Sequence, residues 1–202
     1  LHPLSDICYS LRATIETDTN HTRLHDARMA VNLMPTARNH FILANVQPIA
    51  INAITNYNKA VTLNAQFACA YHNMGIKYQN IKDFSSAVSC YRKCIEIDSN
   101  HFGAYYGLWS SFNKLEDYEQ ALHYAQEGNK KHPKDSLYYF ALGEAYAGLK
   151  KYEEAIRFYR QYLIYYPKDK KARNNLISTI FDLEKEKAKL ISPLFEEAVS
   201  SH

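Results

Sequence analysis

Hydrophobic and aromatic positions recur along this chain with a period of 34 residues. The recurring positions are Tyr71, Tyr105 and Tyr139; Met74, Leu108, Leu142 and Leu176; Tyr78, Phe112, Tyr146 and Ile180; and Ala87, Ala121 and Ala155. Within one period the apolar residues stand three or four positions apart, which is the spacing of one helical face. Because many positions agree on one period, the pattern predicts stacked copies of a single helical unit.

Each unit is predicted to contain two helices joined by a short polar link. Asp83 and Asp117 stand directly before the second apolar stretch of their units, where an N-cap side chain belongs. Pro133 and Pro167 end two of the units, because proline cannot continue a helix. We predict three complete units of this kind, over residues 68–101, 102–135 and 136–169.

Small residues predict where the two helices of a unit approach each other closely. Gly75 and Gly143 occupy the same position of the first helix in their units. Trp109 takes that position in the middle unit, while Ala125 and Gly128 stand where the neighbouring units carry larger side chains. We interpret this as an exchange of volume between facing helices, so Gly128→Leu is predicted to be strongly destabilising.

The pattern weakens on both sides of the three units. Residues 37–67 read as a shortened unit with helices over 37–46 and 49–63. Residues 1–36 read as helical in two pieces, 4–16 and 20–34, and form an N-terminal segment with hints of a degenerate repeat. Residues 170–202 read as a closing pair of helices, with Ser192–Pro193 beginning the second one.

The repeated motif resembles the tetratricopeptide repeat. The run Tyr139-x2-Leu142-Gly143-x2-Tyr146, followed by Ala155-x3-Tyr159, is similar to the family pattern W-x2-L-G-x2-Y…A-x3-F. The resemblance implies an all-α fold: a right-handed α-solenoid of stacked helix-turn-helix units with C-terminal capping helices. It also implies a protein that binds other proteins rather than an enzyme.

Composition and charge narrow the picture only slightly. The chain is 47% hydrophobic and 22% charged, with a formal net charge of +3, so a folded chain without a strong demand for an anionic partner is expected. Four cysteines without a CxxC pair favour free thiols and a reducing, cytoplasmic compartment. No apolar run reaches the roughly 20 residues of a membrane span. Since Leu1 is not preceded by Met, we expect a segment of a longer protein.

Residues that could perform chemistry are few, and no cofactor is predicted. The sequence has no P-loop, dinucleotide glycine motif or G-x-S-x-G. His21, His25 and Asp26 could meet on one helical face as a zinc site would, although exposed polar residues are the more economical interpretation. Cys90 and Cys94 also share a face, and burial in a second helix explains them better than a metal.

The family resemblance implies that the first helices line a concave groove in which a peptide or helix binds. In that register the candidate partner-binding residues are Asn45, His72, Ile76, Gln79, Asn80, Tyr106, Ser110, Asn113, Lys114, Phe140, Glu144 and Asn174. The amides could hydrogen-bond a peptide backbone, and Tyr106 and Phe140 could bury an anchor. The alternative is a solvated polar face without a ligand.

The resemblance also disfavours one ligand, the C-terminal tail of a heat-shock chaperone. Relatives that hold such a carboxylate use a clamp of basic and asparagine side chains. Asn45 and Asn73 are present here, but the basic positions hold Phe41, Gly103 and Gly107. A terminal carboxylate would therefore lose its charge-assisted partners.

Three functions remain open at this point. The chain is an adaptor that binds a partner in the groove, a regulatory or substrate-docking arm of a larger enzyme or complex, or a subunit that self-associates through residues 1–36. A basic edge could suit an acidic partner, but interspersed acidic residues disfavour nucleic acid. This edge consists of Lys130, Lys131, Lys134, Lys150, Lys151, Lys168, Lys170, Lys171 and Arg173.

Overall fold

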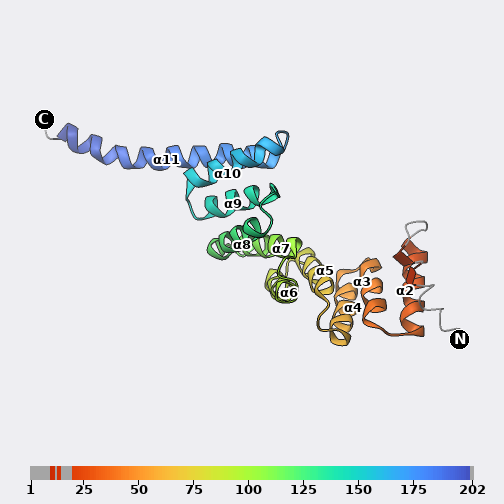
Figure 1. Ribbon diagram of the computed structural model, residues 1–202. Helices are drawn as coiled ribbons and strands as arrows, with labels where there is room; N and C mark the ends of the chain where they lie inside the picture. Colours follow the sequence, from red (N-terminus) through yellow and green to blue (C-terminus); the bar gives the residue numbers. More distant parts are fainter. Residues whose placement is uncertain (1–9, 12, 15–19, 201–202) are drawn as a thin grey trace. The chain divides into compact units, whose positions relative to one another are not determined.

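The regular structure of the chain is helical throughout the described residues (Figure 1). The computed structural model describes residues 10–11, 13–14 and 20–200, with side chains at the first four of these and at 22–189. By its internal contacts the chain divides into two compact units, Leu1–Ser111 and Phe112–His202. The predicted all-α solenoid of helical hairpins is confirmed.

The first unit contains α2 (Asn20–Leu33), α3 (Ala37–Val46), α4 (Ala50–Leu63), α5 (Ala68–Asn80), α6 (Phe84–Ile97) and most of α7 (Phe102–Lys114). From α2 to α6, each helix packs against the next one along the chain (Figure 1). Small and aromatic side chains alternate in the core, which includes Ala44, Ala53, Tyr57, Ala60 and Met74. The helices thus form successive hairpins, and each hairpin buries apolar surface that its neighbour cannot bury alone.

The second unit contains the end of α7, α8 (Tyr118–Lys131), α9 (Leu137–Gly148), α10 (Tyr152–Tyr165) and α11 (Lys170–Ser200). Helix α9 packs against α8 and α10, and α11 packs against α10 and α9. The helix boundaries of α8, α9 and α10 lie within the units predicted over 102–135 and 136–169.

The links between paired helices share one backbone geometry. Lys82, Glu116 and Lys150 have φ angles of 62°, 59° and 58°, so each link turns through the left-handed region once. The following amide closes the link in each case, as in the bond from Asp83 N to the Tyr78 carbonyl at 2.9 Å. The 34-residue period of the sequence therefore appears in the backbone as well.

The predicted N-caps are confirmed. Asp83 accepts a hydrogen bond from the Ser86 amide at 3.0 Å, and Asp117 accepts one from the Gln120 amide at 3.1 Å. Lys151 holds the corresponding place before α10 and makes no side-chain cap. Helices α6 and α8 are thus each capped by the aspartate that precedes them, and α10 begins without this contact.

Close approach of paired helices depends on two glycines facing tyrosine rings. A Cβ added at Gly75 would lie 2.7 Å from the Tyr91 ring, and one at Gly143 would lie 2.7 Å from the Tyr159 ring. At Gly128 the nearest atoms belong to Tyr138, whose ring would lie 2.2 Å from an added Cβ. The side chain that fills the space at Gly128 is therefore a tyrosine of α9.

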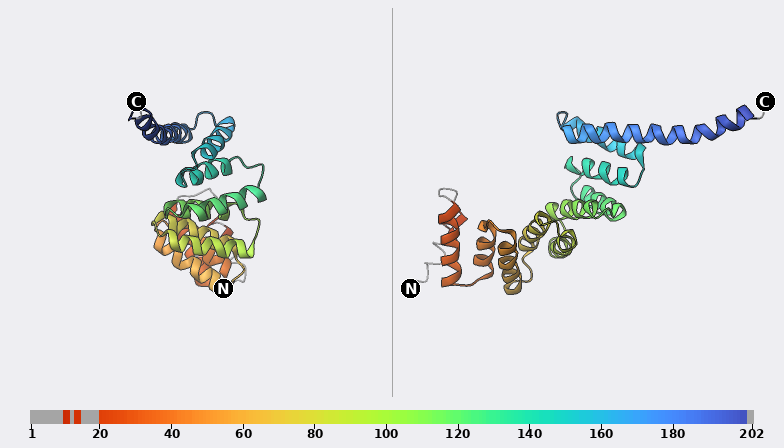
Figure 2. Two further views of the ribbon diagram at one scale, coloured as in Figure 1. Left: turned by 90° about the vertical axis from the view of Figure 1, so that its left-hand side faces the viewer. Right: turned by 180° about the vertical axis from the view of Figure 1, so that it is seen from behind.

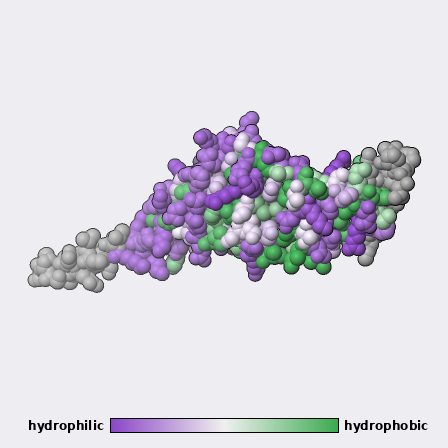
Figure 3. Space-filling view, turned by 90° about the horizontal axis from the view of Figure 1, so that it is seen from below, coloured by the Kyte–Doolittle hydropathy of each residue, from purple (hydrophilic) through white to green (hydrophobic). Residues whose placement is uncertain are grey.

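The C-terminal segment differs from the prediction of a helix pair. Helix α11 runs without interruption from Lys170 to Ser200, so the expected break at Ser192–Pro193 does not occur (Figure 2). Proline removes one backbone donor from a helix, but this loss kinks a helix as readily as it ends one. The side chains that follow Asp182 and Leu183 are exposed and mostly charged as far as Lys189. They form the hydrophilic surface at the described end of α11 (Figure 3).

Candidate functional site

In the first unit, polar side chains of α3 and α5 form a hydrogen-bonded network on the face of the first helices. Asn45 Oδ1 accepts hydrogen bonds from the Tyr57 hydroxyl and from Asn73 Nδ2, the latter at 3.0 Å. Asn73 Oδ1 is 3.1 Å from His72 Nδ1. His72 also stacks on His101, with ring centroids 4.6 Å apart. Burial lowers the pKa of His72 and outweighs the hydrogen bond with Asn73, which raises it, so the neutral imidazole is favoured.

Gln79 occupies the position of Asn45 one period later. Its side chain is also hydrogen-bonded to groups of the first compact unit. Its Oε1 accepts from the Tyr91 hydroxyl at 3.0 Å. Its Nε2 donates to Ser111 Oγ at 2.9 Å and to the Gly107 carbonyl at 3.3 Å. Gln79 therefore joins α5, α6 and α7 and contributes to the structure rather than offering a free amide to a ligand.

The next period breaks this pattern in the second unit. Asn113 follows Gln79 by 34 residues, but Ala125 stands where Tyr57, Tyr91 and Tyr159 carry hydroxyls. Asn113 Oδ1 is buried and has no hydrogen-bond partner among the described residues. Loss of the tyrosine thus leaves one amide of the repeat without its usual donor.

Asn113 lies at the edge of a polar pocket of about 370 Å³, which we call the α7–α9–α11 pocket. The first helices contribute polar groups to it, and second-helix tyrosines form part of its wall. Its lining consists of Asn113, Tyr118, Glu144, Ala147, Gly148, Lys150, Tyr152, Tyr159, Asn175, Ser178, Thr179 and Asp182. The volume is that of a small ligand site or of a pocket for one side chain.

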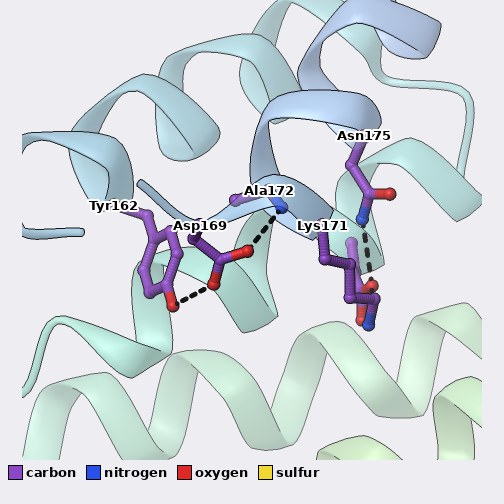
Figure 4. Close-up of polar contacts among 6 residues, drawn as sticks. Tyr162, Asp169, Lys171, Ala172 and Asn175 are labelled. Carbon is purple, nitrogen blue, oxygen red and sulfur yellow. Dashed lines mark hydrogen bonds and ion pairs between the residues drawn. The ribbon is translucent and has the colours of Figure 1, made fainter. Parts of the chain in front are cut away.

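Glu144 is the best-defined group of the pocket. Its side chain is only 12% exposed, and its Oε1 accepts from Asn175 Nδ2 at 3.1 Å and pairs with Lys171 Nζ at 2.7 Å (Figure 4). Both contacts use the same oxygen. Because Lys171 is 66% exposed, a largely buried carboxylate is balanced here by a cation that solvent can reach.

Burial and nearby carboxylates both raise the pKa values of two tyrosines in the pocket wall. Burial raises the pKa of Tyr159, and the charge of Glu144 raises it further. Burial likewise raises the pKa of Tyr152, with additional contributions from Glu186 and Asp182. The lining carries two carboxylates, Glu144 and Asp182, against the single ammonium of Lys150.

Asp169 fixes the start of α11 and thereby positions the α11 side of the pocket. Its Oδ1 accepts from the Ala172 amide at 3.0 Å, and its Oδ2 accepts from the Tyr162 hydroxyl at 2.9 Å (Figure 4). These bonds, the backbone one first, lower the pKa of Asp169. The carboxylate therefore acts as an N-cap and ties α11 to α10.

The predicted partner-binding residues occupy several kinds of environment. Phe140 is only 7% exposed and packs on Tyr162 at 5.2 Å between ring centroids, so it is not the open anchor that was expected. Its burial follows from α10 and α11, which its own helix pattern could not reveal. The Tyr106 ring packs at a tilt against Trp109, with ring centroids 4.7 Å apart. Half-buried positions are His72, Gln79, Tyr106, Ser110, Asn113 and Glu144, and exposed positions are Asn45, Ile76, Asn80, Lys114 and Asn174.

The structure brings Asn113 and Glu144 together in one pocket and adds residues that sequence reasoning missed. Asn175, rather than its neighbour Asn174, bonds Glu144. Thr179 and Asp182 complete this side of the pocket, and they follow Asn175 at helical spacing. The helix start at residue 170 was predicted, so the missing information was which face of α11 packs toward α9.

The groups considered for metal or thiol chemistry have structural explanations. No cluster of three His, Cys, Asp or Glu side chains suited to a metal occurs in the described part of the chain. The side chain of His21 lies outside the described residues. Cys90 and Cys94 are buried free thiols, and burial raises the pKa of each to about 12. Such thiols stay protonated and behave as small apolar side chains.

The basic edge is fully exposed. All nine of its cations, from Lys130 to Arg173, are open to solvent in the second unit. Within the described residues, no helix is long and apolar enough to cross a membrane.

Comparison with known proteins agrees with the repeat found here. Models of the tetratricopeptide repeat match residues 68–101 and 136–169, which are two of the three predicted units. These two stretches are tetratricopeptide repeats. Among curated proteins, none matches its sequence.

Solved structures of MamA share the fold. One MamA structure is 18% identical, covers 80% of this chain and 92% of its own, and has a TM-score of 0.74. A MamA fragment from Desulfovibrio magneticus RS-1 is 22% identical, covers 85% of this chain and 92% of its own, and has a TM-score of 0.67. At these identities the likeness concerns the fold alone. The tetratricopeptide repeats themselves support a protein-interaction scaffold in general terms.

Proposed function

We propose that this chain is a non-enzymatic scaffold that binds a partner peptide or helix on the face of the first helices. The observation that carries the proposal is the α7–α9–α11 pocket. Three first helices supply its polar groups, among them Asn113, Glu144 and Asn175. Amide and carboxylate groups that line a pocket can hydrogen-bond an extended backbone or a polar side chain.

The first unit contributes less to this proposal. Asn45, Asn73 and Gln79 are engaged in bonds within their own unit. Ile76 and Asn80 of α5 are exposed and remain available for contact. We therefore place the specific contacts in the second unit. The three described cysteines are free, which favours a reducing compartment such as the cytoplasm.

The proposal is tested by affinity capture with matched variants. Ser178 lines the pocket and is exposed, so Ser178→Arg fills the pocket with little disturbance of the fold. Ser89→Arg places the same side chain on an exposed position of α6 and serves as the control. We expect partners from a source lysate to be retained by wild type and Ser89→Arg, and lost by Ser178→Arg. Equal retention by all three would reject the pocket face as the binding surface.

A second candidate function is docking of this chain to a larger assembly through α11. Ile177 is 65% exposed and Phe181 is 69% exposed, although both lie in a helix that starts a new period. In a repeat array such apolar side chains are normally covered by the following helix. This observation supports self-association or attachment to a larger complex through α11 as the second candidate.

Sedimentation equilibrium separates the two candidates. If α11 associates, the apparent mass of the wild type rises with concentration, and Ile177→Lys with Phe181→Lys keeps it at the monomer value. A concentration-independent monomer for the wild type would remove self-association.

A further inference from the structure

The α7–α9–α11 pocket presents carboxylates in a unit whose exposed edge is basic. The chain has a formal net charge of +3, and the nine cations of the basic edge all lie in the second unit. The pocket nevertheless presents the carboxylates of Glu144 and Asp182. Two cations lie beside them: Lys150, an exposed side chain in the α9–α10 link that belongs to the lining, and Lys171, which pairs with Glu144.

The structure already contains one cation bound to this site. Lys171 Nζ lies 2.7 Å from Glu144 Oε1, and it also lies 4.7 Å from the centroid of the Phe140 ring. Neither of the contacts described for Glu144 uses Oε2. Glu144 therefore binds an ammonium through one oxygen and has a second acceptor for another donor.

The remaining lining suits a planar cation. Tyr118, Tyr152 and Tyr159 contribute aromatic rings, and Thr179 Oγ1 donates its hydrogen to the Asn175 carbonyl at 2.7 Å. Thr179 Oγ1 can thus only accept from a ligand. A guanidinium has five donors and no acceptor, and it stacks on aromatic faces, so it matches carboxylates, hydroxyl oxygens and rings together. An ammonium could pair with the carboxylates but could not stack on the aromatic rings.

From this complementarity we propose that the α7–α9–α11 pocket binds an arginine side chain of the partner peptide. The proposal rests on the proposed function, because it names the group by which that partner is recognised. Glu144 and Asp182 pair with the guanidinium, and tyrosine rings flank it. Lys171 competes with the ligand for Glu144. It therefore lowers the affinity for every ligand and disfavours peptides that lack a strong hydrogen-bond donor.

A direct test uses a single amino-acid probe rather than an unidentified partner. The 15N-labelled chain is titrated with N-acetyl-arginine methylamide, and the amide shifts of Asn175, Ser178 and Thr179 are followed by NMR. The matched probe is the citrulline analogue, which has the same shape without the charge. We expect saturable shifts at these amides with arginine, at least tenfold weaker binding of citrulline, and weakening by added salt.

Variants separate a binding role from a structural one. Glu144→Gln and Asp182→Asn are each expected to weaken arginine binding about three- to tenfold, as loss of a charged hydrogen bond does. Lys171→Met removes the competing ammonium and is expected to strengthen binding about two- to fivefold, which damage to the fold would not produce. Glu153→Gln changes an exposed carboxylate outside the pocket and should have no effect.

The outcomes distinguish this inference from the proposed function. Equal shifts with arginine and citrulline, or shifts at acidic residues throughout the chain without saturation, would overturn arginine recognition. If Ser178→Arg still loses the captured partner in that case, the binding face stands and only its specificity is different. If Ser178→Arg retains the partner, the proposed function is rejected as well.

Discussion

The hydroxyl of Tyr91 donates a hydrogen bond to Gln79 Oε1 at 3.0 Å, and this pair of positions recurs with the period of the sequence. One period earlier Tyr57 bonds Asn45. One period later Ala125 removes the donor, and Asn113 Oδ1 is left without a partner among the described residues. The repeated positions therefore specify a hydrogen bond as well as apolar contacts. The repeat in which this hydrogen bond is missing contributes Asn113 to the pocket.

This relationship predicts opposite costs at two equivalent positions. Gln79→Ala leaves the buried Tyr91 hydroxyl and Ser111 without a partner and is expected to lower the free energy of unfolding by about 1–3 kcal/mol. Asn113→Ala removes an unsatisfied acceptor and is expected to change it by less than about 0.5 kcal/mol. Urea unfolding of both variants checks this. An equal loss in the two variants would contradict the account of Asn113.

Gly128 faces the Tyr138 ring, and this contact predicts a strict size limit. An added Cβ would lie 2.2 Å from that ring, so Gly128→Leu is expected to cost about 3 kcal/mol. Glu119→Leu on the same helix is the control, because Glu119 is exposed and should shift stability by less than about 0.5 kcal/mol. A melting temperature of Gly128→Leu equal to the wild-type value would refute this packing.

The three left-handed links predict a stabilising substitution. Glu116 has a φ angle of 59°, a conformation that glycine adopts without the steric cost of a Cβ. Glu116→Gly is expected to raise the free energy of unfolding by about 0.5–1 kcal/mol, since the relief of about 1–2 kcal/mol exceeds the added entropy of glycine. Thermal unfolding measures the gain. Glu119→Gly, in the helix that follows, should instead destabilise the fold.

Asp169 predicts a pH dependence of the second unit. The pKa of its carboxyl in the folded state is below the ordinary value, so the bonds to Ala172 and Tyr162 stabilise the fold above that value. Their contribution fades as the pH falls through the lowered pKa. Asp169→Asn is expected to cost about 0.5–1 kcal/mol at pH 7, because this cap is solvent-screened. The difference from wild type should shrink at pH 3; a difference that grew in acid would contradict the assignment.

Much of the fold could be predicted because the repeat encodes local contacts. The period located α5 to α10, and Asp83 and Asp117 identified the starts of α6 and α8. Gly75 and Gly143 correctly indicated close contacts between paired helices. Each of these signals depends on residues that lie close together in one 34-residue repeat.

The site was predicted less completely because it depends on contacts between helices that the pattern of one helix does not specify. Phe140 was expected on the surface, but Tyr162 and Lys171 from later helices lie against its ring. Asn175 was missed in favour of Asn174 because the phase of α11 is set by Asp169. Neither contact leaves a trace in the pattern of a single helix.

The central claim is that a partner binds on the α9 and α11 side of the second unit, and hydrogen exchange of the captured complex tests it most directly. We expect the partner to slow exchange in α9 (Leu137–Gly148) and in residues 170–182 of α11, and to leave residues 122–131 of α8 unchanged. Protection confined to α8, to the basic edge near Lys130 and Lys134, or to α2 to α4 would contradict the account.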